Sequence, residues 1–112
     1  MMSSWVRYHF EHLRRWREYA AAVAKAARDL APGCRVYVIG GVAEGRTTVL
    51  SDIDILIVLP KGTEGRGLYV AIMARAMDQY GLPWDAPVEL HIVNEEGAKH
   101  YLQGGKAIEV SW

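Results

Sequence analysis

Two aspartates stand two residues apart at the start of an apolar segment. Asp52 and Asp54 enclose one isoleucine and lead directly into the run Ile55–Leu59. In a β-strand, residues i and i+2 face the same side, with their Cα atoms about 6.6 Å apart. Two carboxylates side by side in a buried strand would destabilise the fold by several kcal/mol unless a cation compensated them. The pair therefore predicts a site for Mg²⁺ or Mn²⁺. The alternative is an exposed strand end whose carboxylates cap nearby N–H groups.

A glycine pair lies upstream of these carboxylates. Gly40 and Gly41 directly follow the β-branched and aromatic segment Arg35–Ile39. Adjacent glycines let the main chain approach a ligand closely, and turn amides after a strand form a concavity that binds anions. Phosphate is the anion that would also recruit a cation held by Asp52 and Asp54. Taken alone, the glycine pair is equally compatible with an ordinary tight turn.

A third carboxylate occurs in the alternating segment Pro87–Val93. Glu89 and His91 alternate there with apolar residues, so both face away from the core side of a strand. If this strand lies beside the one that carries Asp54, Glu89 completes a two-metal site that orients the attacking oxygen and stabilises the leaving one. His91 shares the face of Glu89. It either contacts a substrate or is a surface or internally hydrogen-bonded histidine.

Helices and strands alternate around these residues. Hydrophobic periodicity, β-branched runs and Pro or Gly breaks predict strands at 35–39, 52–59 and 88–93, helices at 4–30, 66–80 and 94–103, a connection with one helical turn at 42–51, and an edge strand at 108–112. This order predicts an α+β fold in which helices flank one small mixed sheet.

The size and charge of the chain restrict the possible functions. Its 112 residues suffice for one domain, spanning residues 1–112. Lys plus Arg and Asp plus Glu both number 13, so a tail that binds polyelectrolytes is not expected. The single cysteine, Cys34, excludes an internal disulfide and a cysteine zinc cluster. No targeting or membrane segment is apparent, and we expect a cytoplasmic protein.

Positive charge is concentrated near the N-terminus. Residues 1–35 carry a net charge of +4 and residues 36–112 a net charge of −4. The main basic cluster is Arg14, Arg15 and Arg17. It would either contact nucleic acid or an acidic partner, or form the solvated face of a helix, and we favour the solvated face. Nucleic-acid binding is therefore not expected.

The arrangement resembles a known signature. The sequence has Gly40-Gly41, then ten residues, then Asp52-x-Asp54 in an apolar strand. This pattern is similar to the signature of the DNA polymerase β-type nucleotidyltransferase superfamily. The short chain resembles the minimal nucleotidyltransferases (MNT) of that superfamily, and Glu89 matches its third carboxylate. The resemblance implies the nucleotidyltransferase fold.

The resemblance also implies an activity. Gly40 and Gly41 would hold a nucleoside triphosphate, with ATP as the expected donor. Asp52 and Asp54 would bind two Mg²⁺ ions, and Glu89 would bind one of them or activate the acceptor hydroxyl. A nucleoside monophosphate would pass to that hydroxyl, and pyrophosphate would leave.

Residues around the motif add further expectations. Ser51 would hydrogen-bond the phosphates or the turn, and Arg46 would contact phosphate if the connection bends suitably. This sequence has Gly41 where many members of the superfamily have serine, and Glu44 where many have arginine.

Minimal members commonly pair with a HEPN-domain toxin and act as its antitoxin, some of them by adenylylating a hydroxyl on it. The resemblance thus implies a HEPN partner or self-association. The alternative is an inactive antitoxin that masks its partner by contact alone, with Trp5, Trp84 and Trp112 as interface anchors.

Overall fold

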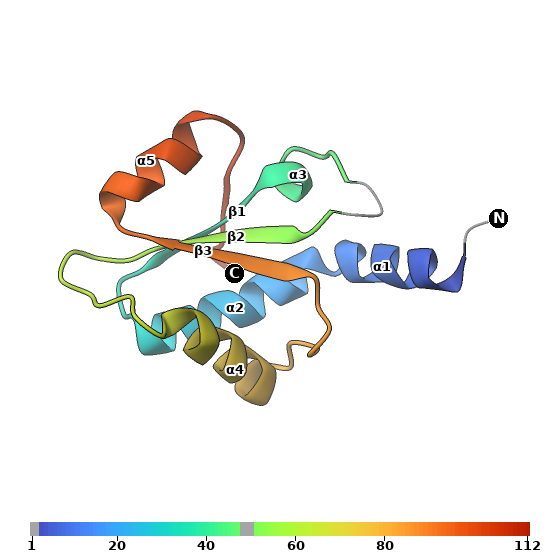
Figure 1. Ribbon diagram of the computed structural model, residues 1–112, viewed down its shortest axis with the longest axis horizontal. Helices are drawn as coiled ribbons and strands as arrows, with labels where there is room; N and C mark the ends of the chain where they lie inside the picture. The colour runs from blue at the N-terminus through green and yellow to red at the C-terminus, as the bar shows by residue number, and fades with distance from the viewer. Residues whose placement is uncertain (1–2, 48–50) are drawn as a thin grey trace.

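A four-stranded mixed β-sheet with helices on both faces forms the middle of the molecule (Figure 1). The structure, a computed structural model, describes residues 3–47 and 51–112. The strands are β1 (Arg35–Ile39), β2 (Ile53–Val58), β3 (Val88–Val93) and β4 (Ile108–Glu109). The helices are α1 (Ser4–Arg14), α2 (Trp16–Leu30), α3 (Gly40–Ala43), α4 (Leu68–Tyr80) and α5 (Glu95–Gln103). The predicted fold class is confirmed.

The order of the strands places the ends of β1, β2 and β3 beside one another. The sheet order is β3-β2-β1-β4; β1 runs antiparallel to both β2 and β4, and β2 runs parallel to β3. A parallel pair needs a crossover connection, which α4 supplies. The register pairs Asp54 with Ile39 on one side and with Glu89 on the other.

The two faces of the sheet are covered unequally (Figure 1). Helices α2 and α4 cover one face, where small alanines of α2 allow close packing against the strands. This larger core includes Val23, Val36, Val38, Ile53, Ile55, Ile57, Ile72 and Leu90. On the other face, α5 forms a smaller core with Ile39, Leu56, Val58 and Ala98. The start of β2 on this second face remains accessible, because Asp54 is only half-buried and Glu89 is exposed.

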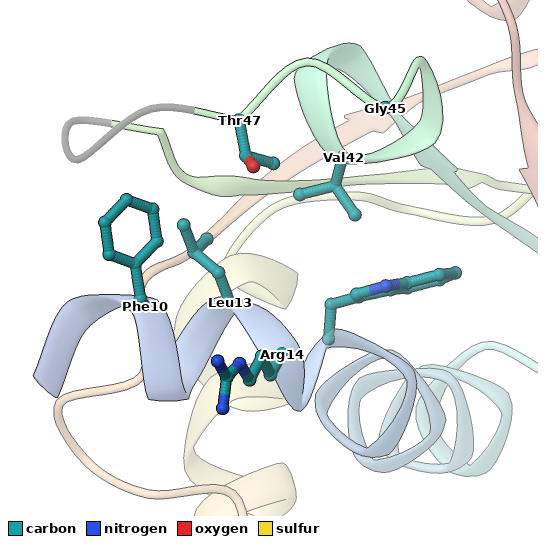
Figure 2. Close-up of a pocket in the computed structure, with 7 residues that line it drawn as sticks. Phe10, Leu13, Arg14, Val42, Gly45 and Thr47 are labelled. Atoms are coloured by element: carbon teal, nitrogen blue, oxygen red, sulfur yellow. The ribbon is translucent and has the colours of Figure 1, made fainter. Parts of the chain in front are cut away.

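The predicted helix over residues 4–30 is wrong in one respect, because it breaks at Arg15 into α1 and α2. The Arg15 N–H bonds to the His12 carbonyl, three residues back, so the last turn tightens and α2 begins in a new direction. Helix α1 projects from the sheet toward the connection between α3 and β2 (Figure 1). A hollow of about 450 Å³ remains between them (Figure 2). Its lining is Phe10, Leu13, Arg14, Trp16, Val42, Gly45 and Thr47.

The helical turn predicted within residues 42–51 lies earlier, at Gly40–Ala43, directly after β1. The remaining predicted elements are present with small shifts at their ends. Strand β2 begins at Ile53 rather than Asp52, and β4 covers only Ile108–Glu109 of the predicted edge strand. Asn94 caps α5, because its Oδ1 accepts a hydrogen bond of 2.8 Å from the Gly97 N–H. None of the helices in the described ranges is long and apolar enough to cross a membrane.

Candidate functional site

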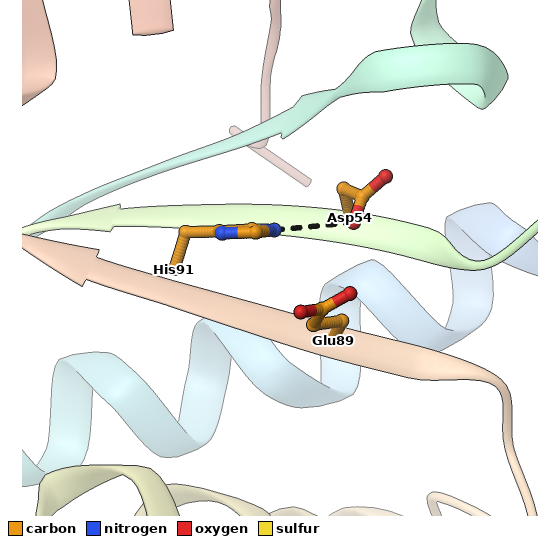
Figure 3. Close-up of side chains that lie close together, drawn as sticks. All are labelled: Asp54, Glu89 and His91. Carbon is orange, nitrogen blue, oxygen red and sulfur yellow. Dashed lines mark hydrogen bonds and ion pairs between the residues drawn. The ribbon is translucent and has the colours of Figure 1, made fainter. Parts of the chain in front are cut away.

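Two carboxylates and one imidazole meet where β2 and β3 run side by side (Figure 3). Asp54 and Glu89 are register partners, and His91 shares the face of Glu89 because it lies two residues further along β3. His91 Nε2 donates a hydrogen bond of 3.1 Å to Asp54 Oδ1. One ligand atom from each of the three side chains lies within 4.8 Å of the other two.

Gly40 closes the site from the side of β1. It has a φ angle of +70°, and a Cβ atom at this position would lie 2.7 Å from Asp54 Oδ2. A side chain would therefore both strain the main chain and collide with the carboxylate. In the described residues, the group that comes close to Gly40 is the Asp54 carboxylate. The approach of a phosphate to the glycine pair stays a prediction.

Gly41 shapes the turn that follows. A Cβ atom there would lie 2.4 Å from the Arg46 carbonyl oxygen, and the Arg46 N–H donates a 2.7 Å bond to the Gly41 carbonyl. The chain therefore closes tightly on itself between these two residues. Ser51 is nearby, since its Oγ lies 3.9 Å from the same Cβ position. Its carbonyl accepts a 2.8 Å hydrogen bond from His9 Nε2. This bond connects α1 to the turn at Gly40 and Gly41, which we call the glycine corner.

In the connection between α3 and β2, the Arg46 side chain forms an ion pair with Glu44. Arg46 Nη2 lies 3.0 Å from Glu44 Oε2, with the Arg46 side chain largely exposed. The Glu44 carboxylate in turn lies against Gly105, 3.6 Å from the position of a Cβ there. The negative charge of Glu44 beside the glycine corner is thus partly neutralised by Arg46. The predicted phosphate contact of Arg46 remains a prediction, because residues 48–50 of the same connection lie outside the described residues.

Asp52 does not join the cluster as expected. It precedes the first residue of β2 and is exposed, and the three groups that converge in the described part of the chain are Asp54, Glu89 and His91. The same-face argument applies only inside a strand, and Asp52 lies one residue outside it. Two carboxylates and a histidine meet here, not the three carboxylates that the sequence predicts. A metal-binding role for Asp52 stays a prediction.

His91 is the member of the cluster whose role the sequence left open. Its place on the same face as Glu89 was visible in the alternation of the segment. The register that pairs His91 with Leu56, and so brings it alongside Asp54, was not. Its ring also contacts Tyr101 of α5, with ring centroids 5.4 Å apart and planes inclined by 49°. The imidazole is therefore held between α5 and Asp54.

The donor set fits a divalent cation. Carboxylate oxygens suit Mg²⁺ and Mn²⁺, and imidazole nitrogen suits the transition metals. The cradle is compact because Gly40 lacks a Cβ. The larger hollow beside α1 is a separate feature that shares none of its lining residues with this cluster. The groups that could bind a cation therefore lie at the accessible end of β2, outside the hollow beside α1.

The basic cluster of the N-terminal helices is engaged locally. Arg14 pairs with Glu11 at 3.1 Å and Arg15 with Glu18 at 2.8 Å. The Arg17 guanidinium stacks over the Trp16 ring, 4.3 Å from its centroid. These contacts favour the solvated helix face.

Comparison with known proteins assigns the family. Residues 21–108 match the model of the nucleotidyltransferase domain, and the chain belongs to that family. Its members usually use divalent metals, in keeping with a transferase whose acidic cluster lies beside a glycine corner.

Two crystal structures share the fold. One is a protein of Sulfolobus solfataricus provisionally assigned as a nucleotidyltransferase, with 20% identity, a TM-score of 0.53, and coverage of 97% of this chain and 87% of that one. The other has the same provisional assignment, with 24% identity, a TM-score of 0.56, and coverage of 78% and 91%. A search of curated proteins gives no match.

Proposed function

We propose that this protein transfers a nucleoside monophosphate, AMP from ATP, to a hydroxyl group of a partner protein. The observation that carries the proposal is the Asp54 carboxylate, held between the Gly40 corner and Glu89 at the accessible end of β2. The family assignment supports the general reaction of nucleotidyl transfer. The donor, the acceptor and the metal are our inference.

In the proposed reaction, different residues of the chain have different roles. A bound divalent ion, Mg²⁺ or Mn²⁺, would neutralise phosphate charge and lower the barrier to attack at phosphorus. Asp54 and Glu89 supply the negative charge that holds it. Gly40 and Gly41 leave main-chain surface without side chains, which lets phosphate oxygens come close. The acceptor oxygen forms a bond to the α-phosphorus, the bond to pyrophosphate breaks, and Glu89 or Asp52 takes the hydroxyl proton.

A protein acceptor is supported by the exposed surface of the domain. Four large hydrophobic side chains of the described residues are more than half exposed: Trp5 at 62%, Tyr8 at 57%, Val70 at 73% and Trp84 at 84%. Aromatic side chains are enriched among the residues that contribute most to protein interfaces. We propose a HEPN-domain toxin as the acceptor, with this protein as its antitoxin. Trp112 is a weaker anchor, since its Nε1 bonds the Arg17 carbonyl and its ring packs on Trp16.

The test is label transfer from ATP labelled at its α-phosphate. The protein, Mg²⁺ and the HEPN-domain protein are incubated together, and label is sought on the acceptor. We expect transfer by the wild type, none by Asp54→Asn, and unchanged transfer by Asp78→Asn, which removes an exposed aspartate from α4. The rate of label transfer by Asp52→Asn shows whether the exposed Asp52 carboxylate contributes to the reaction. No transfer by correctly folded wild-type protein would contradict the proposal.

Neutralisation by contact alone is the second candidate function, favoured by the same exposed tryptophans. The double variant Asp52→Ala/Asp54→Ala separates the two. If it still binds and neutralises the toxin, contact suffices. If it binds without neutralising, transfer is required.

A further inference from the structure

We propose that His91 is a direct ligand of the divalent cation, and that it shifts the preference of the site from Mg²⁺ toward Mn²⁺ and Co²⁺. The inference rests on the proposed function, because it concerns the same cation. It adds a nitrogen ligand that the acidic motif does not contain. The geometry, the positioning of the ring and the chemistry of the donor set each support it.

The distance between the two closest donor atoms matches a shared ion. Two neighbouring ligand atoms of an octahedral ion, each about 2.1 Å from the metal, lie about 3.0 Å from one another. His91 Nε2 and Asp54 Oδ1 are 3.1 Å apart. The distance between Nε2 and Oδ1 therefore matches that between two ligands of one ion. Binding would displace the proton between them and turn the imidazole so that the Nε2 lone pair faces the cation. A Glu89 carboxylate oxygen lies within 4.8 Å of both ligand atoms and is the candidate for a third ligand.

The ring is held in place from the side away from Asp54. Tyr101 contacts the imidazole from α5, and the main chain of β3 is fixed by its parallel pairing with β2. The His91 side chain is 24% exposed and that of Asp54 is 27% exposed, so both remain reachable from solvent. The contact with Tyr101 limits the orientations of the ring, so Nε2 stays close to the Asp54 carboxylate and to the cation that the carboxylate would hold.

The ligand type determines the preference. Mg²⁺ favours oxygen ligands and retains its water, whereas imidazole binds transition metals well. Two carboxylates with one imidazole are therefore a better match for Mn²⁺ and Co²⁺ than two carboxylates alone. The matched control is His100, which lies exposed on α5 and outside the cluster.

The experiment combines pulsed EPR of bound Mn²⁺ with calorimetric titrations of Mg²⁺, Mn²⁺ and Co²⁺. We expect the wild type to show hyperfine coupling from a coordinated imidazole nitrogen. His91→Gln should lose that coupling and bind Mn²⁺ and Co²⁺ about 10- to 100-fold more weakly, with Mg²⁺ changed by no more than about threefold. His100→Gln should behave as the wild type.

Three results would overturn the proposal while leaving the proposed function standing. They are Mn²⁺ bound without nitrogen coupling, coupling that persists in His91→Gln, and equal weakening of all three ions by His91→Gln. The last would make His91 a residue that only positions Asp54. If the wild type binds none of the ions, or if Asp54→Asn binds them as well as the wild type does, the proposed function fails together with this inference.

Discussion

Within residues 3–47 and 51–112, two histidine–aspartate pairs lie in different surroundings. In one, His91 Nε2 lies 3.1 Å from Asp54 Oδ1, at an accessible strand end beside Glu89 and a glycine corner. In the other, His12 Nε2 lies 3.6 Å from Asp85 Oδ2, and the His12 side chain is only 9% exposed. The residue types are the same, and the neighbours differ.

Tyrosine side chains pack around the His12–Asp85 pair and hydrogen-bond to it. His12 Nδ1 lies 2.5 Å from the Tyr19 hydroxyl, and Tyr8 donates a hydrogen bond to Asp85. The Tyr8 ring packs edge-on against the imidazole, with centroids 4.7 Å apart. This network joins α1, α2 and the segment before β3. A closed pair with hydroxyl neighbours holds helices together, whereas an open pair beside another carboxylate can hold a cation.

The largest expected effect separates the two aspartates. Asp54→Asn should lower nucleotidyl transfer by about 10³-fold, because a metal-bound carboxylate contributes several kcal/mol to stabilising the transition state. Asp85→Asn should leave the rate within about threefold of the wild type, since Asp85 lies in the closed pair. Rates of label transfer under saturating ATP measure both. Equal losses of transfer rate in Asp54→Asn and Asp85→Asn would contradict different roles for the two pairs.

The glycine corner allows a matched test. Gly40→Ala places a methyl group 2.7 Å from Asp54 Oδ2 at a φ of +70°, whereas Gly45 has a φ of +73° with nothing within 4 Å of its Cβ position. Both alanine variants should lose about 1–2 kcal/mol of unfolding free energy through backbone strain. Only Gly40→Ala should also lose transfer activity, by about 100-fold, because it displaces a carboxylate that binds the metal.

Urea unfolding and the label-transfer rate measure these two effects separately. A Gly40→Ala protein as active as Gly45→Ala would show that Gly40 serves only the turn.

Removing the buried histidine should affect stability alone. His12→Ala leaves Tyr19 and Asp85 without their imidazole neighbour and should lower the free energy of unfolding by about 2 kcal/mol. His100→Ala, on the exposed face of α5, should change it by less than about 0.5 kcal/mol. Chemical denaturation gives both values. A loss of cation affinity in His12→Ala would contradict the separation of the two pairs.

The smallest effect concerns acid stability. The hydrogen bond from Tyr8 holds the pKa of Asp85 below its ordinary value. A carboxyl whose pKa is lowered by folding stabilises the protein above its unfolded-state pKa of about 3.9, and this contribution is lost as the pH falls through the lower folded-state pKa. The stability difference between the wild type and Tyr8→Phe should therefore shrink on acidification below about pH 4. Urea titrations over that range test it, and a difference that grows toward low pH would contradict the assignment.

The sequence predicted the elements whose signals are local. Strands β1 and β3 agree with their predicted ranges, because β-branched runs end at Gly40 and Asn94. Residue types and spacing predicted that Gly40 and Asp54 lie at one end of the sheet, and that Glu89 joins them if its strand pairs with the strand of Asp54, as it does. The break at Arg15 was not, because the apolar periodicity continues through it. The pairing of His91 with Asp54 depends on the register between strands 37 residues apart, and hydrophobic alternation does not define that register.

We infer that a divalent cation binds between Asp54 and Glu89 and serves nucleotidyl transfer. Paramagnetic broadening by Mn²⁺ in amide NMR spectra of the ATP-bound protein tests it most directly, because the broadening falls off steeply with distance from the ion. We predict that the amide signals of Gly40, Asp54 and Glu89 broaden at the lowest Mn²⁺ additions, before those of Asp85 and α1. Broadening centred on Asp85 or α1, or no selective broadening at all, would contradict the claim.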